Sequence, residues 1–180
     1  MASDPRDAIW NETHQLLYHA NYTEEIEKAL LARWVWLDSA TKITVAISSA
    51  GAALAGLVFW RSADYTFLWP VFTSASALLA IISKQLNVVD KVKQHAAAAS
   101  ELAALGVDIG TLLVRMKINA QFPVADFEKR LLALRERYRV EIKKSDYDVL
   151  LTARIRQRAQ ASVDRARMVP KLPENSHEQR

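Results

Sequence analysis

The chain has 180 residues and a formal net charge of +4; 51% of its residues are hydrophobic and none is cysteine. The lack of cysteine excludes disulfides, thiolate metal sites and cysteine nucleophiles. With only 4 Gly, abundant Ala, Leu, Arg and Glu, and no run that alternates apolar with polar residues, the sequence predicts an almost purely helical, all-α fold.

Charge is unevenly distributed along the chain. Residues 1–42 carry four basic and seven acidic side chains, whereas residues 84–180 carry 19 basic and 12 acidic ones. A basic surface attracts acidic lipid headgroups, nucleic acid or acidic protein segments. The acidic N-terminal part of the same chain satisfies this attraction without a partner, and we favour that interpretation.

Residues 1–42 are predicted to form N-terminal cytoplasmic helices. Pro5 suits the first turn of a helix that we expect to end near Ala20. Asn21 and Glu24 have the spacing of a capping box, which predicts that a second helix begins there.

This second helix is predicted to run without a breaker into the apolar segment that follows it. Its apolar residues recur every three or four positions, at Ile26, Leu30, Trp34 and Leu37. Trp34 and Trp36 are either anchors at a membrane interface or part of a bundle core, and the sequence leaves both interpretations open.

Residues 43–83 contain two uncharged apolar runs, 43–60 and 65–83, separated by a short loop from Arg61 to Asp64. At 1.5 Å per residue each run reaches roughly 27–29 Å, about the thickness of a bilayer's hydrocarbon core. A water-soluble helix of that length normally shows a polar face, and these runs do not. The sequence therefore predicts a two-transmembrane helical hairpin, with a hairpin buried in a soluble all-α domain as the alternative.

The flanks of the hairpin predict its topology. Six basic residues lie close to its outer ends, Lys28, Arg33, Lys42, Lys84, Lys91 and Lys93, against Arg61 alone in the loop. The positive-inside rule then predicts a multi-pass protein of the inner (cell) membrane with both termini in the cytoplasm. Trp60, Tyr65 and Trp69 are predicted to anchor the loop at the far interface. Pro70 either kinks the second span or opens it.

Residues 84–168 are predicted to form a C-terminal cytoplasmic helical region, with 169–180 as a flexible tail. The second membrane helix is expected to continue beyond Ser83 as a stem that ends at Gly106, and Asp108 is expected to cap a third helix. Pro123 is predicted to open the next helix and Ser145 to cap the last. Inward-facing residues are expected at Phe127, Leu131, Leu134, Tyr138 and Ile142, with near-heptad spacing, and at Leu151, Ile155, Ala159 and Val163. Outward-facing residues of the last helix are expected at Arg154, Arg158 and Arg165.

The sequence contains no motif that carries catalytic chemistry. P-loop, Rossmann glycine, His-Glu-x-x-His and nucleophile-elbow patterns are all missing, so we predict neither an enzyme nor a cofactor or metal site. The four histidines, His14, His19, His95 and His177, lack ligand spacing and are interpreted as solvated or packed. Glu24, Glu25 and Glu27 are interpreted as residues of a first helical turn that favour the helix dipole. The basic last helix lacks interleaved aromatic residues, so direct nucleic-acid binding is not expected.

Small and hydroxyl-bearing residues gather in the predicted spans. They are Thr44, Ser48, Gly51, Ala52 and Gly56 in the first span and Thr73, Ser76, Ala80 and Ser83 in the second. Such faces let helices approach closely in lipid, and helix packing alone explains them. A sharper interpretation is that several hairpins assemble and that the hydroxyl groups line a narrow, weakly selective pore.

The layout of the chain resembles a known family. The residues that carry the resemblance are His19 to Glu24, which lead into the first span, and the tight hairpin at 43–83, within a matching region of roughly 12–168. They are similar to the SLATT domains, the SMODS- and SLOG-associating two-transmembrane effector domains of bacterial conflict systems. The resemblance implies an antiphage or abortive-infection effector that oligomerises and permeabilises the inner membrane.

The resemblance also implies a partner. A separate sensor protein would signal infection: a nucleotide-signal synthase, a nucleotide-binding domain or a reverse transcriptase. It supplies no catalytic residues. The alternative function is a two-transmembrane scaffold that forms no pore and recruits a partner to the inner membrane.

Overall fold

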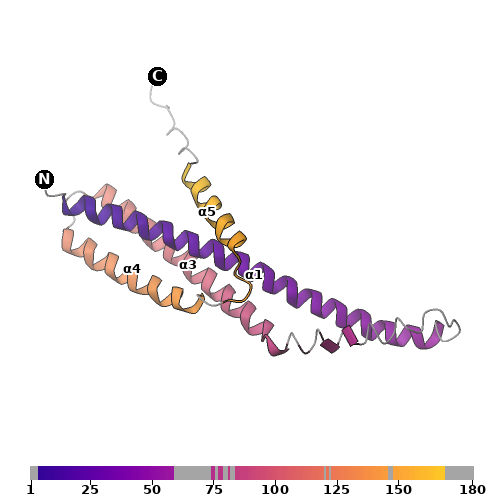
Figure 1. Ribbon diagram of the computed structural model, residues 1–180. Coiled ribbons are helices and arrows are strands. Elements are labelled where there is room, and N and C mark those ends of the chain that lie inside the picture. Colours follow the sequence, from indigo (N-terminus) through magenta and orange to yellow (C-terminus); the bar gives the residue numbers. More distant parts are fainter. Residues whose placement is uncertain are drawn as a thin grey trace, which may run out of the picture. The chain divides into compact units, whose positions relative to one another are not determined.

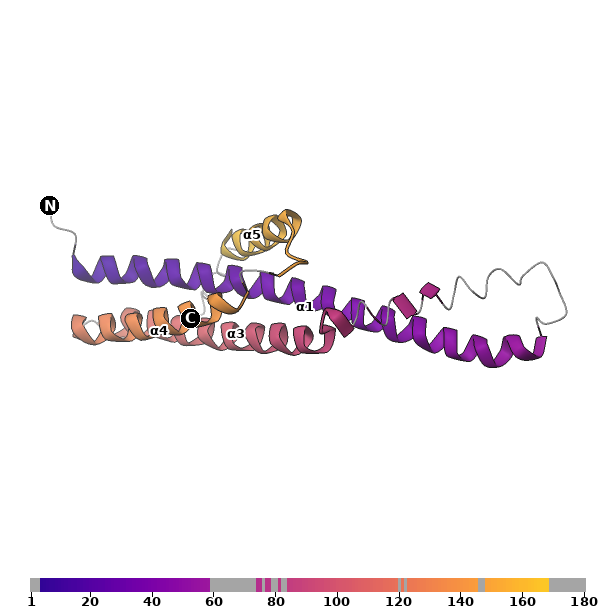
Figure 2. The same ribbon diagram turned by 60° about the horizontal axis from the view of Figure 1, so that its bottom comes forward.

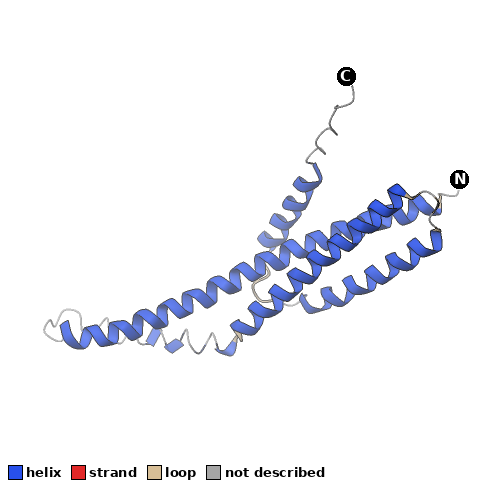
Figure 3. Cartoon of the chain, turned by 180° about the vertical axis from the view of Figure 1, so that it is seen from behind, coloured by secondary structure: helices blue, strands red, loops and turns tan. Residues whose placement is uncertain are grey.

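The structure is a computed structural model that describes residues 4–58, 84–119, 123–145 and 148–168, with 74–75, 77–78, 81 and 121 as shorter pieces; of residues 48–58, 144–145 and 168 it describes the backbone alone. All regular secondary structure in these ranges is helical, which confirms the all-α prediction (Figure 3). The long helices of this part are α1 (Pro5–Val58), α3 (Val88–Ile118), α4 (Val124–Ser145) and α5 (Ala153–Met168). The chain divides into two compact units, Met1–Leu30 with His95–Arg180, and Leu31–Gln94.

Helix α1 is uninterrupted from Pro5 to Val58, so the predicted helix end near Ala20 and the cap at Asn21 are wrong. Leu16 and Ala20 are buried in the core of the first unit. Leaving the helix at Ala20 would remove that side chain from the core, and packing of this kind outweighs a local capping signal. Asn21 lies inside the helix, where its Oδ1 is 3.3 Å from the position that a Cβ on Gly106 would take.

The buried positions of α1 repeat with heptad spacing. They are Thr13, Leu16, Ala20, Glu27, Leu30, Trp34 and Thr41, separated by three, four or seven residues. Helix α3 has the same rhythm at Val88, His95, Ala98, Leu102, Leu105, Ile109 and Leu112. Each helix therefore carries one seam of the coiled-coil type, here called the α1 seam and the α3 seam.

Helix α3 has different ends from those predicted. A stem continuing beyond Ser83 was expected, but Leu86 and Asn87 form a turn and the helix starts again at Val88. Asn87 adopts a left-handed conformation with φ 46°, and its carbonyl accepts the Asp90 and Lys91 amides at 2.9 and 3.0 Å. Asparagine tolerates this conformation better than most residues, which explains why the break falls there.

The predicted break at Gly106 and cap at Asp108 are also wrong, because α3 continues through both to Ile118. Leu105 and Ile109 on either side of them are fully buried. Asp108 is exposed and forms an ion pair with Arg137 of α4 at 2.6 Å instead of capping a helix.

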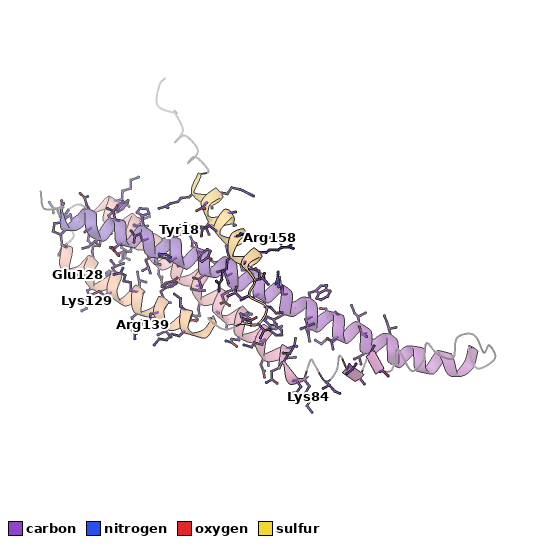
Figure 4. The ribbon with its side chains drawn as sticks, viewed as in Figure 1. Tyr18, Lys84, Glu128, Lys129, Arg139 and Arg158 are labelled. Carbon is purple, nitrogen blue, oxygen red and sulfur yellow. The ribbon has the colours of Figure 1, made fainter. Side chains whose placement is uncertain are left out.

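Helix α4 completes a three-helix core in the first unit. It begins directly after Pro123, as predicted, and buries Phe127 and Leu131 against α1 and α3. Leu134 and Tyr138 pack on the same cluster, which confirms the near-heptad face as far as Tyr138, and Ile142 is half-buried outside that cluster. Figures 1 and 2 show α4 and α3 running alongside the N-terminal part of α1. The opposite face of α4 is solvated, with Glu128, Lys129 and Arg139 pointing outward (Figure 4).

Helix α5 begins later than predicted. Ser145 is the last residue of α4, and the backbone carbonyl of Thr152 accepts the first amides of α5, from Ile155 and Arg156. Ser145 therefore does not cap the last helix. The predicted faces of that helix are confirmed at Ile155, Ala159 and Val163, which are buried, and at Arg154, Arg158 and Arg165, which are exposed. Leu151, also predicted to face inward, is half-buried and precedes the helix.

Trp34 and Trp36, in the second unit, Leu31–Gln94, differ in burial. Trp34 is 1% exposed and belongs to the α1 seam, whereas Trp36 is 71% exposed. Trp34 is therefore a core residue, and Trp36 keeps a large apolar ring outside the protein core.

Candidate functional site

The predicted first span is described as far as Val58, and its backbone is helical throughout as the continuation of α1. In this segment Ile43, Val45 and Ile47 are 57%, 40% and 61% exposed. Successive positions on a helix point about 100° apart, so Ile43 and Ile47 leave the helix on nearly the same side and Val45 leaves it on the opposite side. A helix with exposed apolar side chains on opposite sides is unusual in water.

Of the residues predicted to line a pore or pack the spans, Thr44 alone has a described side chain. The others have a described backbone only or lie outside the described residues. Thr44 is half-buried, and its Oγ1 donates a hydrogen bond to the Ala40 carbonyl at 2.8 Å, so its hydroxyl is satisfied within α1. Ser48, Gly51, Ala52 and Gly56 lie on the helical backbone of α1, where spacings of four place Ser48, Ala52 and Gly56 in one row. Outside the described residues lie Thr73, Ser76, Ala80, Ser83 and the predicted anchors Trp60, Tyr65 and Trp69.

Among the residues whose side chains are described, one helix is long and apolar enough to cross a membrane, and it is α3. It is not one of the two predicted spans. About a third of its apolar window is buried, and core helices of soluble proteins meet the same criterion. The α3 seam, with Leu102, Leu105 and Ile109, is packed in the first unit, and that packing accounts for much of the apolar composition of α3.

A buried histidine between two carboxylates is the site that sequence reasoning missed. His95 on α3 lies with its Nδ1 2.6 Å from Glu27 Oε2 of α1 and its Nε2 3.0 Å from Asp148 Oδ2 of the α4–α5 connection. Their side chains are only 1–2% exposed. We call these three residues the histidine cluster.

Electrostatics favour a charged imidazole in this cluster. Burial lowers the pKa of His95, but the hydrogen bonds to Glu27 and Asp148 and their negative charges outweigh burial, so the pKa of the imidazole lies above its usual 6.5. The imidazolium has two N–H groups and donates one to each carboxylate. In the part of the chain that the structure describes, no group of three or more His, Cys, Asp or Glu residues is placed to hold a metal ion.

Glu27 and His95 occupy seam positions that are otherwise apolar or small. The expectation that Glu24, Glu25 and Glu27 lie in a first turn is wrong, because all three lie in the interior of α1. Glu24 forms an ion pair with Lys28 at 2.7 Å, and Glu27 is buried with its Oε1 lacking a hydrogen-bond partner among the described atoms. A polar residue at a seam position commonly fixes the register of helix pairing. The sequence does hold one indication of this site: Glu27 and His95 fall at the heptad positions that are otherwise apolar in their helices.

Polar groups attach α5 to α1. The Tyr18 hydroxyl donates to Asp164 Oδ1 at 3.0 Å and accepts a hydrogen bond from Gln160, and the Arg167 guanidinium lies 5.4 Å from the centre of the Tyr18 ring. Burial and the hydrogen bond to Asp164 raise the pKa of Tyr18 above 10.0. Figure 4 shows Tyr18 on the side of α1 that faces α5. Ser162 of α5 donates to Glu25 at 3.3 Å.

Comparisons of the chain with protein-family models, with curated proteins and with solved structures find no match.

Proposed function

We propose that the chain is a two-span membrane effector whose hairpin, residues 43–60 and 65–83, assembles with other copies and permeabilises the inner membrane when a separate sensor signals. The observation that carries the proposal is the exposed apolar segment at Ile43, Val45 and Ile47 on an unbroken helix. Exposed apolar side chains on opposite sides of a helix need lipid or other apolar helices around them.

Helix α3 is not assigned as a span in this proposal. Its seam already packs in a protein core, and Asp108 on it forms an ion pair with α4. The two runs of the hairpin, 43–60 and 65–83, carry no charged side chain. The SLATT resemblance adds the role in antiphage defence.

The experiment is a measurement of membrane potential in bacteria that express the chain from an inducible promoter. We expect depolarisation by the wild-type chain and its loss in Gly56→Leu and Ser76→Leu, because a bulky side chain blocks close helix approach. Ala125→Leu, at an exposed position of α4, is the matched control for added apolar bulk and should depolarise like wild type. Depolarisation that survives deletion of residues 43–83 would rule the proposal out.

The alternative is a scaffold that forms no pore. The row of exposed arginines on α5, Arg154, Arg158 and Arg165, favours this alternative, because it offers a basic surface to an acidic partner. If the chain is a scaffold, cells that insert it fully into the membrane should keep a normal membrane potential, with and without candidate sensors. Gly56→Leu and Ser76→Leu should then leave partner recruitment unchanged.

A further inference from the structure

The histidine cluster joins three parts of the chain that are distant in sequence. Glu27 belongs to α1, His95 to α3, and Asp148 to the connection that leads from α4 into α5. Asp148 also shapes that connection, because its Oδ1 accepts the Leu150 amide at 2.8 Å and its carbonyl accepts the Leu151 amide at 3.0 Å. Asp148 therefore holds the turn that leads toward α5, and its carboxylate also binds the buried histidine.

The remaining attachment of α5 is modest. Its buried side chains are Ile155, Ala159 and Val163, which are small or medium in size. Its polar contacts to α1 are one part-buried hydrogen bond, from Tyr18 to Asp164, and exposed ones through Gln160 and Glu25. Exposed polar contacts contribute little to stability, so the buried contact between His95 and Asp148 carries a large share of the attachment.

Protonation decides whether His95 can hold both carboxylates. The imidazolium donates to Glu27 and Asp148 at once, but a neutral imidazole has one N–H and turns a lone pair toward the other carboxylate. The Asp148 contact is the longer of the two, 3.0 Å against 2.6 Å, so we expect the remaining proton to stay with Glu27. The cations nearest in sequence are Lys28 on α1, which pairs with Glu24 and Glu25, and Lys91 and Lys93 on α3, which are half-buried and exposed. On α4, Lys143 is exposed. Among the described residues, the two carboxylates are the hydrogen-bond partners of the ring.

We propose that Glu27, His95 and Asp148 form a pH-gated latch that fastens α5 to the α1–α3–α4 core and releases it when His95 loses its proton. Release uncovers the buried row at Ile155, Ala159 and Val163 together with the surface of α1 around Tyr18. The freed segment is then a basic amphipathic helix. The latch acts within the first unit and stands independently of the proposed membrane role.

The direction of the pH effect follows from the raised pKa of His95. A group whose pKa is higher in the folded state stabilises that state fully below its unfolded value, here 6.5, and the stabilisation disappears as the pH rises through the folded value. The latch is therefore closed below pH 6.5 and opens as the pH rises through the pKa of folded His95, which lies above that value.

Hydrogen exchange of the full chain in detergent, followed by mass spectrometry between pH 6 and pH 10, tests the latch. After correction for the intrinsic pH dependence of exchange, we expect the protection of peptides from 153–168 to fall by about ten- to a hundredfold with rising pH, since one buried charged hydrogen bond is lost. Peptides from the α3 core around Leu105 serve as the internal reference and should keep their protection.

Two variants distinguish a latch from a merely structural contact. In His95→Gln the protection of α5 should be low and flat across the pH range, whereas His14→Gln, a histidine beside Trp10 at the other end of α1, should follow wild type. In Asp148→Asn, the amide can donate to the neutral imidazole and still accept the Leu150 amide, so α5 should stay protected at alkaline pH. Wild-type protection of α5 that does not change with pH, or an Asp148→Asn profile that matches wild type, would overturn the latch.

Discussion

Trp34 and Trp36 show how strongly two residues of one type can differ within a single turn of helix. Trp34 occupies the α1 seam and is almost completely buried, whereas Trp36 leaves the helix on another side and is mostly exposed. A buried tryptophan stabilises a fold through its large apolar area, and an exposed one contributes little. Their roles therefore separate into core packing for Trp34 and contact with lipid or a partner for Trp36.

Trp34→Ala should lower the free energy of unfolding by about 3–5 kcal/mol, because it removes a large buried side chain and leaves a cavity. Trp36→Ala should change it by less than about 0.5 kcal/mol, since the position is exposed. Thermal or denaturant unfolding in detergent, followed by circular dichroism, measures both. Equal losses in the two variants would contradict the burial difference.

The histidine cluster marks the limit of sequence reasoning at the residue scale. His95 has its partners 68 and 53 residues away in sequence, so no local spacing connects them. The interpretation as a packed or solvated histidine describes its burial but misses its two carboxylates. Heptad phase identifies Glu27 and His95 as seam residues, but it does not tell which partners they meet.

At the scale of single elements, tertiary packing overrides local helix signals. The predicted ends at Ala20 and Gly106 rest on local chemistry, and at both points buried positions continue along the helix on either side. The prediction that Pro123 opens a helix is confirmed, since α4 begins at Val124. Proline has no backbone N–H to donate, so packing cannot draw it into the interior of a helix. The break at Asn87 is the converse case, since no strong local signal predicts it and its left-handed backbone reveals it.

The two glycines inside α3 allow a matched test of this conclusion. A Cβ at Gly110 would meet nothing within 4 Å, so Gly110→Ala should raise the free energy of unfolding by about 0.5–1 kcal/mol through helix propensity. A Cβ at Gly106 would lie 3.3 Å from Asn21 Oδ1, so Gly106→Ala should gain less. Denaturant unfolding compares the two, and in an Asn21→Ala background the difference should disappear. A larger gain at Gly106 in the wild-type background would contradict the close packing with α1.

At the scale of the whole molecule, the all-helical class and the inner faces of α4 and α5 could be predicted from periodicity, which depends only on local sequence. How the chain sits in a membrane depends on the lipid bilayer as well as on water. Most of residues 59–83, which include the second predicted span, lies outside the described residues. The predicted topology rests on the distribution of basic residues around the two spans. Both spans, and the termini in the cytoplasm, therefore remain predictions.

Single cysteines test that topology cleanly, because the natural chain has none. In intact cells a cysteine at Ser62→Cys should react with an impermeant maleimide from outside, since the loop follows the first span. A cysteine at Ser176→Cys should react only after the membrane is permeabilised. Labelling of both positions in intact cells, or of neither, would contradict the hairpin.

The heptad rhythm of the α1 seam limits how the length of this chain can vary in evolution. Thr13 and Thr41 stand at either end of a seam without a loop between them. One inserted residue would turn every later position by about 100° and carry the Trp34 ring out of the core. Homologous chains should therefore differ in α1 by steps that preserve phase, such as seven or eleven residues, and should place other length changes in the connections that flank α4.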